Sequence, residues 1–199
     1  MKNVGLVIVF TLFGAFSAQA QNSTDLIQFG VKAGANFATI TGDDFESPES
    51  RTAFHAGVLA ELPVNERFSI QPEILYSAQG FSADGTFGGV DYTAEYKMDY
   101  IQVPILAKIY LVNGLNFQVG PQVGFRINES VEFDTDLGES SEDFNSEEND
   151  IDFGVAAGLE YKFDGGFFIQ GRYNYGFSEI YEDTDAHNSV IQAGIGFMF

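Results

Sequence analysis

The strongest constraint on the fold is an alternation of apolar and polar residues with a period of two, which recurs in eight separate segments. In residues 27–37, for example, Phe29 and Val31 alternate with Gly30 and Lys32. This pattern is typical of β-strands whose two faces meet different surroundings, and no segment shows a sustained helical period. The predicted strands are residues 27–37, 52–62, 68–79, 98–110, 115–128, 151–163, 167–177 and 189–199.

The connections between these segments alternate between short and long. The short ones are residues 63–67, 111–114 and 164–166, and the long, polar ones are residues 38–51, 80–97, 129–150 and 178–188. An even strand number with this alternation is typical of transmembrane barrels, in which short turns are periplasmic and long loops are extracellular. Each segment can cross a bilayer as a tilted strand, and closure is required because an open edge would leave backbone groups unpaired in lipid. The sequence therefore predicts an all-β fold: an eight-stranded antiparallel up-and-down transmembrane β-barrel with four long extracellular loops and three short periplasmic turns.

The distribution of charge supports this prediction. The four long connections hold 21 of the 29 acidic residues, but only Arg51 and Lys97 among the basic ones. Charged residues within or beside the strands are assigned to the polar face, and their signs are roughly balanced. They are Lys32, Lys108, Arg126, Lys162, Arg172, Glu61, Glu73, Asp99, Asp152 and Glu160. Because a small barrel has room inside only for side chains, and buried charges need partners, we predict a lumen plugged by ion pairs; a narrow ion path is the alternative.

Aromatic residues lie near both ends of the predicted strands, as they do in the girdles of membrane barrels. One set is Phe29, Phe68, Phe117, Tyr161, Phe167 and Phe197, and the other is Phe37, Phe54, Tyr76, Phe125, Phe153 and Tyr175. A water-soluble barrel or sandwich, with its apolar faces turned inward, is the alternative fold. Pro72, Pro104 and Pro121 lie inside predicted strands, where each removes a ladder donor, so we expect a bulge at some of them.

Residues 1–20 have the features of a secretory signal peptide. Lys2 supplies the positive charge, residues 4–16 form an apolar stretch too short to span a bilayer, and Ala18-Gln19-Ala20 is a small-x-small cleavage pattern. We expect cleavage before Gln21, with a retained membrane anchor as the alternative. The predicted division is a signal peptide at residues 1–20 and an outer-membrane barrel domain at residues 21–199, exported to a Gram-negative outer membrane.

Composition excludes several classes of function. The chain has no Cys, which removes disulfides, thiolate zinc sites and thiol nucleophiles. Its net charge of −20 argues against a nucleic acid as partner, because no excess of Lys or Arg is available to neutralise phosphates.

Several stretches resemble a known family. Residues 29–37 (FGVKAGANF), 55–58 (HAGV), 68–77 (FSIQPEILYS) and 100–108 (YIQVPILAK) are similar to the PorT-like outer-membrane β-barrel family. The chain also ends in alternating apolar residues that close on Phe199, which resembles the signal that outer-membrane barrels present to their assembly machinery. The resemblance implies a fold and a compartment, but it implies no activity.

His55 is the first candidate for chemistry, because it lies on a strand and is expected inside the lumen near the outer rim. Some membrane-embedded lipid hydrolases use a His–Ser pair in which the imidazole is the base, and Ser77 or Ser189 is the residue that could approach His55. A lumen histidine bonded to a neighbour is the alternative. We expect no enzyme activity, no catalytic residue and no cofactor.

The connection at residues 129–150 is the second candidate, since it holds ten acidic residues and no basic one. Clustered carboxylates bind hard divalent cations, and Asp134, Asp136 and Glu139 are the candidate ligands, although their spacing departs from a calcium loop. The same charge could attract a basic surface partner, or keep the loop solvated by self-repulsion.

The expected partners are outer-membrane lipid, the barrel-assembly machinery through Phe199, and a basic partner or divalent cations at the acidic loops. The predicted function is a structural, adhesive or accessory role through these loops. A porin-like small-solute channel and a lipid hydrolase that uses His55 are the alternatives.

Overall fold

A computed structural model describes residues 26–42, 49–87, 90–135, 138–143, 151–179 and 186–199. Over these ranges no helix is long and apolar enough to cross a membrane. The strands are β1 (Gln28–Thr41), β2 (Glu49–Asn65), β3 (Phe68–Phe87), β4 (Val90–Tyr110), β5 (Leu115–Thr135), β6 (Gly138–Asp143), β7 (Ile151–Lys162), β8 (Phe167–Gly176) and β9 (His187–Met198). The predicted signal peptide lies outside the described residues.

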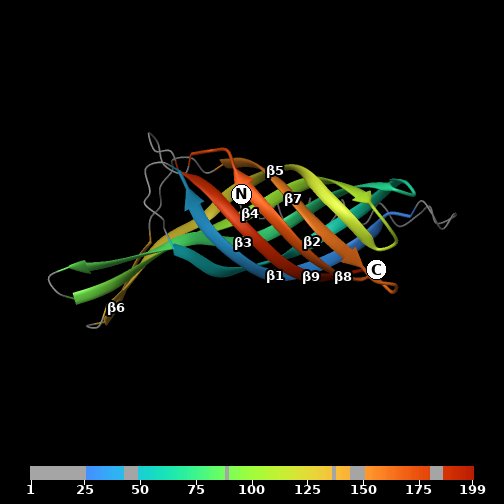
Figure 1. Cartoon of the computed structure of the whole chain (residues 1–199). Helices are drawn as coiled ribbons and strands as arrows, with labels where there is room; N and C mark the ends of the chain where they lie inside the picture. The colour runs from blue at the N-terminus through green and yellow to red at the C-terminus, as the bar shows by residue number, and fades with distance from the viewer. Residues whose placement is uncertain (1–25, 43–48, 88–89, 136–137, 144–150, 180–185) are drawn as a thin grey trace, which may run out of the picture.

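Eight of these strands close into a ring in which each strand is antiparallel to both neighbours. The order around the ring is β1-β2-β3-β4-β5-β7-β8-β9, and β9 pairs back with β1. Val31 of β1, for example, lies between Val58 of β2 and Phe197 of β9. Figure 1 shows these strands winding obliquely around a common axis. The predicted eight-stranded antiparallel barrel is therefore confirmed, and β6 is an additional strand that pairs with β5 beyond the ring.

The barrel is apolar outside and polar inside. Val31, Phe54 and Ile191 are 47%, 55% and 57% exposed on the outer surface, whereas Lys32 and Gln192 on the inner surface are buried. A water-soluble barrel would have the reverse arrangement, because exposing apolar side chains to water and burying charges both cost free energy. The alternative with inward apolar faces is therefore wrong.

The strands end close to their predicted positions at the short connections. Residues 111–114 separate β4 from β5 as predicted, and β3 and β8 begin at the predicted Phe68 and Phe167. Gly114 has φ +80° and Gly166 has φ +93°, a backbone conformation that side chains with a Cβ rarely adopt. In the remaining turn, β2 extends to Asn65, whose Oδ1 accepts a hydrogen bond from the Arg67 backbone N–H at 2.9 Å.

The long connections differ from the prediction, because strands occupy much of them. Residues 80–97 were expected to form a loop, but β3 and β4 continue through this range as a hairpin, and Figure 1 shows this hairpin projecting from one end of the ring. β4 also pairs with β5 up to Thr135, and β5 pairs with β6, so β3, β4, β5 and β6 form a four-stranded antiparallel extension, hereafter the outer sheet. The alternation that reports a lipid-facing strand is lost there, although cross-strand pairs such as Phe81 and Tyr96, stacked at 4.5 Å, still support pairing.

The prolines do not produce the expected bulges. The register between β3 and β4 is the same at Pro72–Ile105 and at Leu75–Gln102, and the β5–β7 register runs unbroken through Pro121. Register shifts instead occur between Ser50 and His55, between Pro63 and Asn65, and between Asp99 and Tyr100. Losing one donor therefore interrupts the ladder without inserting a residue.

Asp99 also lies on a different face from the one predicted. Its neighbours Met98 and Tyr100 are both buried on the inner side, and Asp99 between them is only partly buried. Because successive side chains of a strand point to opposite faces, Asp99 faces outward. The error came from grouping Asp99 with the inner-face charges, although it has the same parity as the outward-facing Ile101.

Candidate functional site in the barrel lumen

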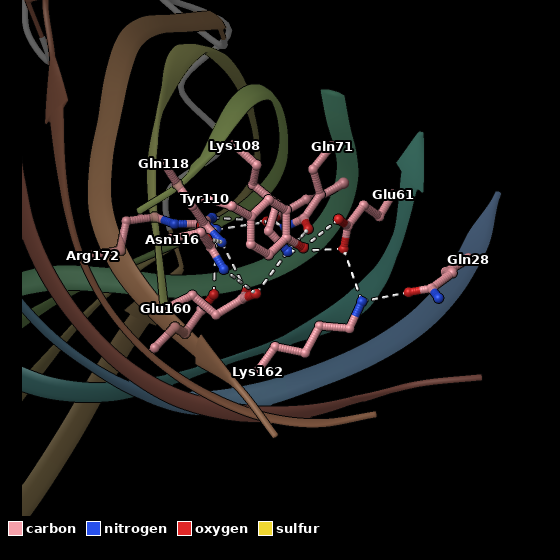
Figure 2. A network of polar contacts seen from close by, with 12 residues as sticks. Gln28, Glu61, Gln71, Lys108, Tyr110, Asn116, Gln118, Glu160, Lys162 and Arg172 are labelled. Atoms are coloured by element: carbon pink, nitrogen blue, oxygen red, sulfur yellow. Dashed lines mark hydrogen bonds and ion pairs between the residues drawn. The ribbon is translucent and has the colours of Figure 1, made fainter. Parts of the chain in front are cut away.

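The centre of the polar lumen, toward the short turns, is Lys108 on β4. Its ammonium group donates hydrogen bonds to Glu160 Oε1 at 2.7 Å, Gln71 Oε1 at 2.9 Å and Glu61 Oε2 at 3.0 Å, and the residue is fully buried. These partners come from three other strands, β2, β3 and β7, so the contacts cross the lumen (Figure 2). A buried ammonium is stable only when its charge and its N–H groups find partners, and Lys108 has both.

Glu61 and Glu160 are bound by further donors. Tyr110 donates its hydroxyl to Glu61 Oε1 at 2.5 Å, and Lys162 Nζ lies 3.3 Å from Glu61 Oε2. Lys162 also donates to the Gln28 side chain. Asn116 Nδ2 and Gln118 Nε2 donate to the two oxygens of Glu160 at 3.2 and 2.8 Å.

Arg172 extends the network along the lumen. Its two terminal nitrogens donate to the two oxygens of Glu73 at 2.8 Å each, which is the bidentate geometry of a strong arginine–carboxylate pair. Arg172 Nη2 also donates to Gln118 Oε1 at 2.8 Å, which connects this pair to Glu160. Lys32 Nζ lies 2.7 Å from Glu73 Oε2, so Glu73 is shared by two cations.

Next along the lumen is a group of amides around His55. Asn36 Nδ2 donates to the backbone O of Ala78 at 2.7 Å and to Ser77 Oγ at 3.0 Å, which identifies Asn36 Oδ1 as the acceptor. That Oδ1 accepts from Gln192 Nε2 at 3.0 Å and faces His55 Nδ1 at 2.8 Å. The Nδ1 of His55 therefore carries a proton, which leaves Nε2 as an acceptor when the ring is neutral.

Apolar side chains cover the lumen toward the outer sheet. Ile40, Phe81, Met98 and Tyr100 form one buried cluster. Beside it Asn188 Nδ2 donates to the Tyr100 hydroxyl at 3.2 Å and to Asp152 Oδ2 at 3.1 Å. Arg126 Nη1 pairs with Glu129 Oε2 at 3.2 Å, both side chains being largely buried.

The outer sheet has a separate, more exposed set of ion pairs. Arg51 Nε lies 3.5 Å from Glu95 Oε2, and Lys97 Nζ lies 3.4 Å from the same oxygen. Lys97 also pairs with Glu132. The two basic residues that the sequence placed in the long connections therefore bind acidic residues of the long connections, and two of these three ion pairs join different connections.

The structure places nine of the ten predicted inner-face charges inside, and Asp99 is the exception. Lys32, Lys108, Lys162 and Arg172 are all bound to Glu61, Glu73 or Glu160. The sequence did not single out the neutral members, Gln71, Tyr110, Asn116, Gln118, Asn36 and Gln192. Their signal was their parity, since each alternates with outward-facing apolar residues along its strand.

His55 and Ser77 are register partners on β2 and β3, as the sequence-based candidate pair required. Both are bound to Asn36, however, and His55 is fully buried within the lumen, away from the lipid-facing surface. Ser189 Oγ instead lies 3.0 Å from the Tyr173 hydroxyl. His55 and Ser77 are therefore close to each other, but they have no access to membrane lipid.

The candidate cation ligands are only partly placed. Asp134 of β5 and Glu139 of β6 are backbone partners in the outer sheet, and Asp136 lies outside the described residues. Within the ranges the structure describes, no group of three or more His, Asp or Glu residues is arranged to hold a metal. A cation site at these three positions remains a prediction.

Comparison with known proteins gives a family match. Residues 19–182 match the family described as outer membrane protein beta-barrel domain, whereas no curated protein matches the sequence. Similar solved structures include Neisserial surface protein A (14% identity, 86% of this chain, 97% of that chain, TM-score 0.54). Another is Ail, the attachment invasion locus protein of Yersinia pestis (14% identity, 86% of this chain, 98% of that chain, TM-score 0.51). At this identity the structures support the fold, and the match over residues 19–182 shows that the chain belongs to the outer membrane protein beta-barrel domain family, whose place is the outer membrane.

Proposed function

We propose that this protein is a non-conducting outer-membrane barrel that has a structural, adhesive or accessory role through its outer sheet and acidic connections. The observation that carries the proposal is the network around Lys108, Glu160 and Arg172, whose hydrogen bonds join strands on different sides of the lumen. Ions would have to break these contacts in order to pass, so the surface available for function is the outer one.

The proposal includes an orientation. The outer sheet and the acidic connections face the cell exterior, and the short turns face the periplasm, after removal of residues 1–20. Assembly uses the C-terminal strand β9 and Phe199, which directly follows it and is 72% exposed. Within the family, the stretches quoted above favour a PorT-like relationship.

Conductance in planar bilayers tests the closed lumen. We expect the wild-type barrel to insert without discrete current steps. A double variant, Lys108→Gly with Arg172→Gly, removes two cations that cross the lumen and is expected to conduct if it assembles. A matched variant at Lys97, which lies in the outer sheet, should stay silent. Steady conductance of the wild type would instead favour a small-solute channel.

Attachment is the first role to test, because acidic connections favour a basic partner and the structurally similar Ail is named as an attachment protein. The β3–β4 hairpin can be shortened by replacing residues 82–95 with Asn-Gly, which retains the stacked pair Phe81–Tyr96 and closes the hairpin with a favoured turn. A second variant replaces the nine carboxylates of residues 130–150 with amides and leaves Glu129 paired with Arg126.

Cells that display each form are scored for binding to polylysine-coated and polyglutamate-coated beads. We expect the wild type to bind polylysine and the variant with amides at residues 130–150 to bind it less. Neither of these two proteins should bind polyglutamate. Calcium titration of the same two proteins tests the cation alternative, since only the wild type has Asp134, Asp136 and Glu139. Equal polylysine binding by both forms would overturn the adhesive role of the acidic connections.

The proposal also holds that the protein is not an enzyme. A His55→Ala variant should leave the lipid A profile of the expressing strain unchanged. A lipid A species that depends on His55 would refute this part of the proposal.

A further inference from the structure

The lumen network contains more positive than negative charge. Among the described residues, the contacts that run from Lys162 to Lys32 connect four cations with three carboxylates. They are Lys32, Lys108, Lys162 and Arg172, and Glu61, Glu73 and Glu160. A buried network with one uncompensated charge is costly, because little water is present to screen it.

The excess charge lies where Lys32 and Arg172 share Glu73. Elsewhere, Lys108 and Lys162 are matched by Glu61 and Glu160. Asp152 does not provide compensation, since it lies six residues along β7 from Gly158, the register partner of Arg172, a separation of about 20 Å along the strand.

Hydrogen-bond donors without acceptors are found at this same place. Arg172 Nε and Gln170 Nε2 are buried and find no hydrogen-bond partner among the side chains and backbone that the structure describes, whereas Lys32 Nζ has its ion pair with Glu73 at 2.7 Å. The amide of Gln170 is oriented by Arg172 Nη2, which donates to Gln170 Oε1 at 3.3 Å and leaves the amide N–H groups free. Buried donors of this kind are normally satisfied, so their grouping beside an excess cation indicates an electron-rich ligand.

Gly194 lies beside one of these donors. A Cβ built on Gly194 would lie 3.0 Å from the backbone O of Ala33, 3.1 Å from His55 Nε2 and 3.5 Å from Gln170 Nε2, so one donor and two acceptors face the point above this glycine. His55 Nε2 and Gln192 Oε1 are acceptors that also lack a partner within the described part of the chain. Water that accompanies an ion can donate to these acceptors.

From this charge balance and these donors we propose that the lumen binds one monovalent inorganic anion of halide size, together with water, beside Gln170 and Arg172. The anion accepts the free N–H groups of Gln170 and Arg172 and brings the network to electrical neutrality. His55 and Gln192 bind its hydration water.

Bromide is the probe, because it scatters X-rays anomalously. Crystals of the wild-type barrel grown in sodium bromide should show an anomalous peak within hydrogen-bond distance of Gln170 Nε2 and Arg172 Nε. A lumen that holds only water at this point, or bromide peaks only elsewhere, would overturn the proposal and leave Lys32 as the group that must become neutral.

A melting experiment distinguishes a built site from binding at crystal concentration only. Sodium bromide replaces sodium gluconate at constant ionic strength while the unfolding midpoint of the detergent-solubilised barrel is measured. Above the dissociation constant, each tenfold rise in bromide should raise the folding equilibrium constant about tenfold for a single site. An anomalous peak without this dependence would be an adventitious ion only, and would count against the proposal.

Two variants make the test specific. Lys32→Met removes the excess charge and leaves Glu73 bound to Arg172, and Gln170→Glu supplies a carboxylate in place of the anion. Both should lose the bromide dependence, whereas Lys97→Met in the outer sheet should retain it. Equal bromide dependence in Lys32→Met and wild type would contradict the assigned site, and because either variant alone suffices, failure of one to fold leaves the test intact.

Discussion

Replacing Lys108 with Met should destabilise the barrel by about 3–5 kcal/mol, the usual cost of removing one partner from a buried ion pair. The ammonium of Lys108 is fully buried and lies between Glu61 and Glu160, donating a hydrogen bond to each carboxylate. After its removal, Glu61 still has Lys162 and the Tyr110 hydroxyl, so the carboxylate left without a cation is Glu160.

This asymmetry makes a double-mutant cycle decisive. Glu160→Gln alone should cost about 1–3 kcal/mol, because Lys108 retains Glu61 and Gln71 as acceptors. In the Lys108→Met background the same change removes the stranded charge. We therefore expect the double variant to be more stable than the sum of the single effects implies, by up to about 3 kcal/mol.

The assay is urea unfolding in detergent or lipid, followed by the shift in gel mobility between folded and boiled protein, since the chain has no Trp to serve as a fluorescent reporter. Lys97→Met is the matched control, because Lys97 is a partly exposed lysine whose ion pairs should contribute at most about 1 kcal/mol. If Lys108→Met lost no more stability than Lys97→Met, or if the two single effects simply added, the assigned coupling between Lys108 and Glu160 would be refuted.

Further predictions concern assembly, the strand residue Gly80, which has a positive φ, and the short hydrogen bond of Tyr110. Wild-type protein from isolated outer membranes should migrate differently before and after boiling, and identical mobility would argue against a closed membrane barrel. Gly80→Ala should destabilise the barrel by about 1–3 kcal/mol, because Gly80 has φ +127° and the new Cβ would meet the backbone O of Tyr96. Gly171 has open space around it, so Gly171→Ala should be tolerated in the same unfolding assay. Tyr110→Phe should cost about 1.5–3 kcal/mol through loss of its hydrogen bond to Glu61, and an unchanged unfolding midpoint would exclude that contribution. Phe199→Ala should lower the amount of barrel recovered in the outer membrane while leaving the unfolding midpoint of assembled protein near that of wild type, and equal recovery would argue against a role in assembly.

The alternation of residue types predicted the fold because lipid and lumen impose opposite requirements on the two faces of each strand. The same parity placed Lys32 and Glu73 inside, but it did not show that Glu73 of β3 would be bound by Arg172 of β8. That contact joins strands that are not neighbours in the ring, and it depends on the tilt and stagger with which the barrel closes. Sequence alternation within one strand contains no information about this closure.

The outer sheet was missed for a related reason. Beyond the barrel wall both faces of β3 and β4 are away from the bilayer, so neither face needs to be apolar and the period-two signal fades. Pairs such as Phe81 with Tyr96 are visible only after the strands have been aligned. Acidic, polar composition predicts exposure, but it does not distinguish an exposed loop from an exposed hairpin.

The polar lumen also provides a reason for the barrel to adopt one register. A slip of β8 by one residue against both of its neighbours, β7 and β9, would turn Arg172 toward the lipid, which the apolar outer face alone already penalises. A slip of two residues keeps every apolar side chain outside, so the outer face scarcely opposes it. The lumen does oppose it, because Arg172 would move about 7 Å along the strand, away from a carboxylate that it now contacts at 2.8 Å. In a membrane, where burial of apolar surface does not distinguish such registers, ion pairs between distant strands are the interactions able to select one of them.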